Sequence, residues 1–142
     1  MLQTHIQDSI ADVQALIAIT KEDIEDIKQA KHEAVFARMK PKEYLIDAFF
    51  HKKELAKEII QGLVEQRPGV EVRELIGPEA VALFDTLNTH LFELKEENLR
   101  FARLSAAVGE FYHSMLDNLI PSESDYRGRH ISKDVSFISV DA

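Results

Sequence analysis

The stretch from Phe84 to Leu119, FDTLNTHLFELKEENLRFARLSAAVGEFYHSMLDNL, decides the fold because its apolar residues recur with a seven-residue period. Phe84, Leu91, Asn98, Ser105, Tyr112 and Leu119 take heptad position a, and Leu87, Leu94, Phe101, Val108 and Met115 take position d. A repeat held over about five heptads predicts one long helix with a coiled-coil seam. Pro78 is well placed to open this helix and Pro121 to end it, so we expect it over residues 79–120.

A second heptad pattern runs through the N-terminal part of the chain. Ile10, Ile17 and Ile24 take the a positions, and Val13, Thr20 and Ile27 take the d positions. Neither Gly nor Pro interrupts this pattern before Pro41. We therefore predict a first helix over residues 2–39.

A shorter helix is predicted between these two, over residues 42–66, because Pro41 suits a first helical turn and Arg67-Pro68-Gly69 is a stop signal. Its apolar stripe consists of Leu45, Phe49, Leu55, Ile59 and Leu63. Residues 70–77 fit a short strand or an extended connector equally well. We therefore expect an all-α fold, in which long antiparallel coiled-coil-like helices form a three-helix or dimeric bundle over residues 1–121, with a flexible C-terminal tail at 122–142.

The charge balance restricts the kind of partner. Lys and Arg number 17 against 25 Asp and Glu, which gives a formal net charge of -8. This charge repels phosphate backbones, so nucleic acid is not an expected partner. The N-terminus has no signal-peptide pattern, and its longest apolar run, Ala15 to Ile19, is too short to cross a bilayer. We therefore expect a single-domain cytoplasmic protein without membrane insertion.

Motifs for catalysis or metal binding are incomplete in this sequence. His32-Glu33 begins a zinc-protease motif, but Phe36 stands where the second His is required. Glu110 and His113 have the spacing used in di-iron bundles, yet only one such pair is present and the heptad phase turns both residues outward. The six histidines are scattered and are interpreted as surface residues, and the chain has no cysteine. We expect no enzyme activity, no cofactor and no metal.

Asn98 is a polar residue in the a row of the long helix. An asparagine at this position commonly fixes the register or the number of partners in a coiled coil, at some cost in stability. Alternatively, Asn98 faces a solvated part of the seam. The pattern alone favours neither interpretation.

Several features resemble the FlgN-like family of bacterial export chaperones for flagellar hook-associated proteins. The resemblance is diffuse and spans most of the chain. It includes the long first helix followed by Lys52-Lys53-Glu54-Leu55, and Glu97-Asn98-Leu99 within a long last helix that continues through Leu116. A short tail containing Tyr126 and Gly128 completes it.

The resemblance implies a small cytoplasmic chaperone that binds the helical C-terminal segment of a hook-associated protein and presents it to the flagellar type III export apparatus. Because that family binds its cargo toward the C-terminus, it implies binding by Phe111, Tyr112, Met115, Leu119 and the tail around Tyr126. The same stripe also fits an intramolecular core. The alternative function is a self-associating structural or regulatory coiled coil, in which a homodimer buries the seam.

Overall fold

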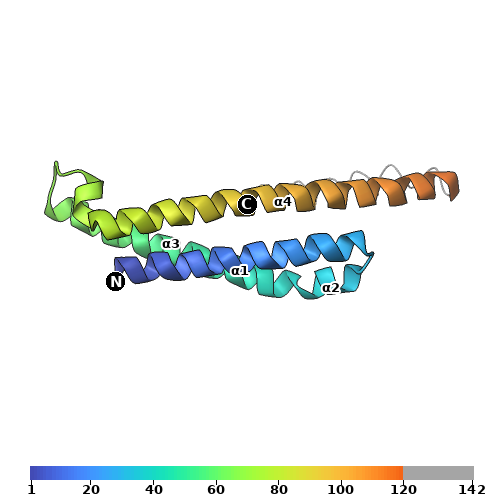
Figure 1. Cartoon of the computed structure of the whole chain (residues 1–142), viewed down its shortest axis with the longest axis horizontal. Coiled ribbons are helices and arrows are strands. Elements are labelled where there is room, and N and C mark those ends of the chain that lie inside the picture. The colour runs from blue at the N-terminus through green and yellow to red at the C-terminus, as the bar shows by residue number, and fades with distance from the viewer. Residues whose placement is uncertain (120–142) are drawn as a thin grey trace. The chain divides into compact units, whose positions relative to one another are not determined.

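The computed structural model describes residues 1–119, and helices account for 91% of them. No strand occurs in this part of the chain, so the all-α prediction is confirmed. The helices are α1 (Leu2–Lys28), α2 (His32–Ala37), α3 (Met39–Gln66) and α4 (Val72–Leu119) (Figure 1). The expected tail at 122–142 lies outside the described residues.

Helix α1 is shorter than the predicted helix over residues 2–39. It ends at Lys28, and a turn through Ala30 precedes α2. The amide of Lys31 donates to the carbonyl of Asp26 at 2.7 Å and the amide of Ala30 to that of Ile27 at 3.0 Å, while Ala30 adopts a φ of 59°. These are the two hydrogen bonds of a Schellman C-cap. This cap is hard to predict from the sequence, because alanine stands where glycine usually takes the left-handed conformation.

Helix α3 begins slightly before the predicted residue 42 and ends at Gln66, as predicted. Pro41 lies in its first turn, where the missing amide hydrogen costs little. Gly69, in the stop signal after the helix, adopts a φ of 87°. Residues beyond it differ from the prediction, because Val72 to Ile76 are helical rather than extended, and only Gly77 (φ 87°, ψ 164°) interrupts α4 before Pro78.

The chain divides into two compact units. Of the described residues, 1–19 and 37–94 form unit 1, and 20–36 and 95–119 form unit 2. The apolar core of unit 1 combines Ile6, Val13, Leu16 and Ile17 of α1 with Ala80, Leu87 and Leu94 of α4. Leu45, Ile46 and Phe49 of α3 pack against it while remaining partly exposed. The core of unit 2 consists of Ile24, Ile27 and Phe101, with Val35, Leu104 and Val108 packed around them.

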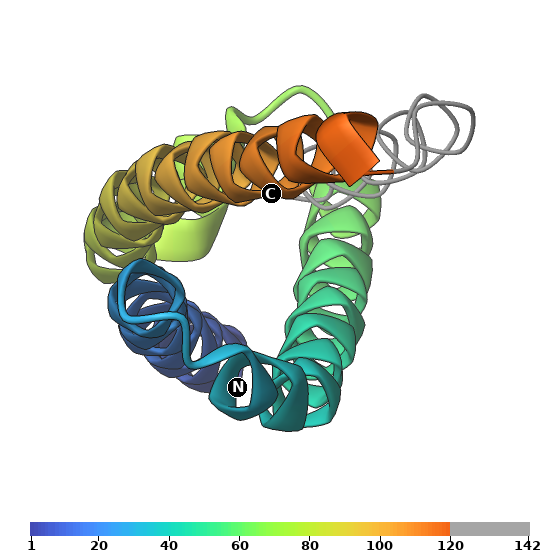
Figure 2. The ribbon, with the colours of Figure 1, turned by 90° about the vertical axis from the view of Figure 1, so that its right-hand side faces the viewer.

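Helices α1 and α4 run parallel in unit 1. Gln3 contacts Glu79 and Gln14 contacts His90, and both pairs are separated by 76 residues in sequence. Helix α3 runs in the opposite direction, and a 2.6 Å ion pair between Lys52 and Asp12 joins it to α1 (Figures 1 and 2). The chain reverses direction twice between α1 and α4, so consecutive long helices run antiparallel and the first and last run parallel.

The C-cap of α1 generates a stability prediction. A left-handed conformation costs an alanine more than a glycine, so Ala30→Gly should raise the free energy of unfolding by about 0.5–1 kcal/mol. The matched control is Ala18→Gly, an exposed position inside α1, which should lower it by about 1 kcal/mol. Urea denaturation followed by circular dichroism measures both. Equal destabilisation by the two substitutions would contradict the cap.

Candidate protein-binding surface

The seam of α4 changes from buried to exposed along the helix. Leu87, Leu94 and Phe101, at d positions, are each no more than 8% exposed. Val108, the next d residue, is half-buried, and Met115 is 47% exposed. The heptad spacing does not change along this length. The end of α4 thus carries seam residues without the cover that the same positions have earlier.

The exposure begins where α1 ends. In unit 2 the Thr20 hydroxyl meets the Asn98 side-chain oxygen, an offset of 78 residues. Because parallel helices rise equally per residue, this offset places Lys28, the last residue of α1, level with Ala106 of α4. Beyond that level, the ring of His32 at the start of α2 lies 6.3 Å from the ring of Tyr112 in an edge-to-face contact. Helix α2 is only six residues long, so it covers little of α4.

In the described part of unit 2, four large apolar side chains are exposed, and we call them the α4-end surface: Phe36, Phe111, Tyr112 and Met115. Phe111 and Met115 are four residues apart on α4 and share a face. The rings of Phe111 and Tyr112 are in edge-to-face contact at 5.9 Å. Phe36 is four residues after His32 and therefore shares the face of α2 that meets Tyr112.

The predicted partner-binding residues are only partly described. Phe111, Tyr112 and Met115 come together on the α4-end surface. The side chain of Leu119 and all of Tyr126 lie outside the described residues. The binding role of these residues stays a prediction. Sequence reasoning missed Phe36, because a continuous first helix would have turned it away from the seam.

The flanks of the seam lose their charge toward the end of α4. In the central heptads the flanking e and g positions carry Lys95 and Glu97. From residue 102 onward they carry Ala102, Leu104, Gly109, Phe111, Leu116 and Asn118, none of which is charged. Ala102 and Gly109, at e, are buried, whereas Phe111, at g, is 62% exposed. The two acidic residues of this stretch, Glu110 and Asp117, fall at f, opposite the seam.

Asn98 is buried, with 8% of its surface exposed, so the interpretation that it faces solvent is wrong. Thr20, which is fully buried, donates its hydroxyl hydrogen to Asn98 Oδ1 at 3.5 Å. The two residues are a d residue of α1 and an a residue of α4. A polar pair therefore interrupts the apolar seam inside unit 2, and its role in fixing register stays a prediction.

Three of the histidines are less exposed than predicted. One ring nitrogen each of His32, His90 and His113 is inaccessible to solvent. His113, expected on the outer face, is half-buried and lies 3.5 Å from the Asp117 carboxylate. Within residues 1–119, no three His, Asp or Glu side chains are grouped so that they could hold a metal ion. None of the helices described there is both long and apolar enough to span a membrane.

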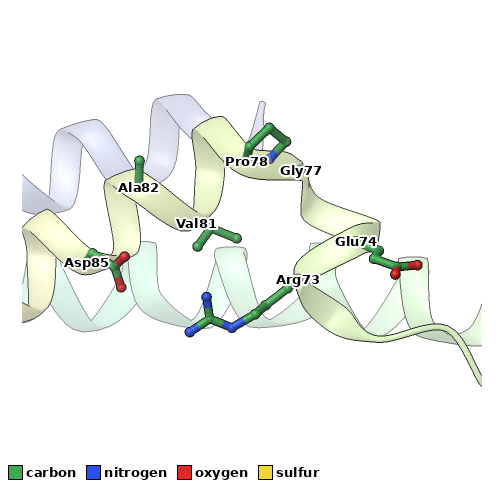
Figure 3. Close-up of a pocket in the computed structure, with 7 residues that line it drawn as sticks. All are labelled: Arg73, Glu74, Gly77, Pro78, Val81, Ala82 and Asp85. Atoms are coloured by element: carbon green, nitrogen blue, oxygen red, sulfur yellow. The ribbon is translucent and has the colours of Figure 1, made fainter.

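An open hollow lies at the bend of α4 in unit 1 (Figure 3). Its lining residues are Arg73, Glu74, Gly77, Pro78, Val81, Ala82 and Asp85. The side chain of Arg73 extends beneath Val81, whereas Glu74 points away from it. All seven residues belong to α4, so the hollow follows from the break at Gly77.

No known family model, curated protein or solved structure matches this chain. The resemblance to the FlgN-like chaperones stays a prediction.

The buried pair generates a second prediction. Thr20→Val keeps the shape of the side chain but removes the hydroxyl that Asn98 meets, which should lower the free energy of unfolding by about 1–3 kcal/mol. Adding Asn98→Leu should recover most of this loss, because both polar groups are then absent. Urea denaturation of the single and double variants measures the coupling.

Thr89→Val is the matched control for this cycle. Thr89 lies on the exposed side of α4 and its hydroxyl donates only to the carbonyl of Asp85, so the change should stay within about 0.5 kcal/mol. A double variant less stable than Thr20→Val alone would refute the pairing.

Proposed function

We propose that this chain binds an amphipathic helical segment of another protein at the α4-end surface. The observation that carries the proposal is the seam of α4, which is buried as far as Phe101 and continues with unchanged spacing onto the exposed Tyr112 and Met115. Seam residues at a and d positions are suited to receiving the knobs of another helix. Clustered exposed apolar side chains are typical of protein interaction sites.

The size of the surface favours a short segment over a large rigid partner. The residues Phe36, Phe111 and Tyr112 are 68%, 62% and 45% exposed. At about 150–250 Å² for each aromatic side chain, they offer roughly 250–450 Å². A stable interface between two folded proteins buries about 800 Å² on each partner. A segment that folds onto the surface and continues beyond it suits this area better than a symmetric contact between two copies.

The family resemblance suggests which protein supplies the segment. On this basis the chain is a cytoplasmic chaperone whose helices pack as a coiled-coil-like bundle, and its cargo is the helical terminus of a flagellar hook-associated protein. Binding would cover the apolar face of a polymerisation helix until the cargo is delivered to the type III export apparatus. The position of the α4-end surface, toward the C-terminal part of the chain, supports this proposal.

Self-association is the alternative function. Tyr112 and Met115 take the positions that a second copy would also use to complete a coiled coil. Sedimentation analysis separates the two functions, because a structural coiled coil is a tight dimer without any partner, whereas the chaperone presents a free surface.

A double substitution tests the proposed binding. Phe111→Asp/Met115→Asp should weaken capture of a purified hook-associated protein at least about tenfold, because two charges then enter an apolar contact. Both residues are exposed, so circular dichroism should show the helices unchanged. Isothermal titration calorimetry with the full chain measures the affinity.

Phe92→Asp is the matched control for the double variant. Phe92 is 65% exposed on the same helix, but it belongs to unit 1. It should bind like the unmodified chain. Equal loss of binding in Phe92→Asp and in the double variant would show that the α4-end surface is not the site.

A further inference from the structure

We infer that the segment received by the α4-end surface is a helix with a wide, uncharged apolar face, recognised by apolar contact rather than by charge. This inference rests on the proposed function and specifies its partner. The partner would carry apolar residues at the flanking e and g positions as well as at a and d.

The first support is the change in the flanks of α4. A helix that pairs with one neighbour through a narrow seam usually carries charged residues at e and g, as α4 does at Lys95 and Glu97. Over residues 102–119 no flanking position is charged. An apolar band of this width packs against more than one helix. The exposed part of the band therefore requires a partner that is itself apolar at its flanks.

The second support is the difference between the two flanks of that band. On the e side, the small residues Ala102 and Gly109 are buried, so this side offers no open surface. On the g side, Leu104 is half-buried and Phe111 is 62% exposed. The g side, which carries the ring of Phe111, is thus the exposed side of the band. Continuity with the buried seam places the partner along Phe111, Tyr112 and Met115.

The third support is the position of the nearby charges. Glu110 and Asp117 lie at f, on the face opposite the seam, and Asp117 is close to the His113 ring. No Lys or Arg occurs between Leu104 and Leu119. Lys31, which precedes α2, and Glu33 of α2 flank His32 with opposite charges. Among residues 1–119, the surface consequently has no charged row with which to select a basic or an acidic segment.

Two matched synthetic helices test the inference. Both have about 18 residues and the same Leu and Ile at a and d, but one carries Leu and Ala at e and g and the other carries Lys and Glu there. Fluorescence anisotropy of each labelled peptide with the full chain gives its affinity. The wide-faced peptide should bind at least about tenfold more tightly, and its affinity should change less than about threefold between roughly 50 and 500 mM NaCl.

Two adjacent substitutions localise the effect. Phe111→Lys places a charge at the exposed g position. It should lower the affinity of the chain for the wide-faced peptide at least about tenfold. Glu110→Lys introduces the same residue one position earlier, on the opposite face, and should leave the affinity within about twofold. Circular dichroism checks that both variants keep their helices.

The outcomes separate this inference from the proposed function. Equal binding of both peptides would leave the proposed function standing and overturn the wide-face requirement. Binding of neither peptide would overturn both. A chain that is dimeric on its own, and becomes monomeric with Phe111→Lys, would show that a second copy occupies the surface and would also overturn the inference.

Discussion

The parallel pairing of α1 with α4 is the contact on which the rest of the structure depends. In unit 1 it buries Ile6 and Val13 with Leu87 and Leu94, and in unit 2 it buries Ile24 and Ile27 with Phe101. Full burial of each such side chain contributes about 1.5–3 kcal/mol relative to exposure. Helix α3 contributes much less, since Ala56 is its only buried residue. The remaining elements are thus positioned around one continuous heptad repeat on each of two helices.

The length mismatch between those two helices determines where the chain has an exposed surface. Helix α1 ends at Lys28, where the carbonyls of its last turn are satisfied by a Schellman cap rather than by a further helical turn. Helix α4 continues to Leu119. The seam of α4 therefore continues beyond the end of α1. The exposure of Tyr112 and Met115 is a direct consequence of the turn at Ala30.

Much of the fold follows from the seven-residue period, and the exceptions have local causes. The period predicts the long last helix and its seam, and the stop signal Arg67-Pro68-Gly69 predicts the end of α3 at Gln66. It does not predict the end of α1, because Ala30 carries none of the preference for a left-handed conformation that glycine has. Because this turn was not predicted, the position of Phe36 on the α4-end surface was not predicted either. The exposure of Phe111 depends on which helices lie beside it, and a single helix pattern carries no such information.

The buried polar pair bears directly on that exposure. A heptad seam can slip by seven residues while still matching apolar rows, and such a slip of α1 toward the end of α4 would cover part of the exposed seam. It would also move Thr20 away from Asn98 and bring Val13 opposite it, which leaves a buried amide against an apolar side chain. That loss costs about 1–3 kcal/mol. We therefore predict that Thr20 and Asn98 oppose this slip and favour the register in which Tyr112 and Met115 stay exposed.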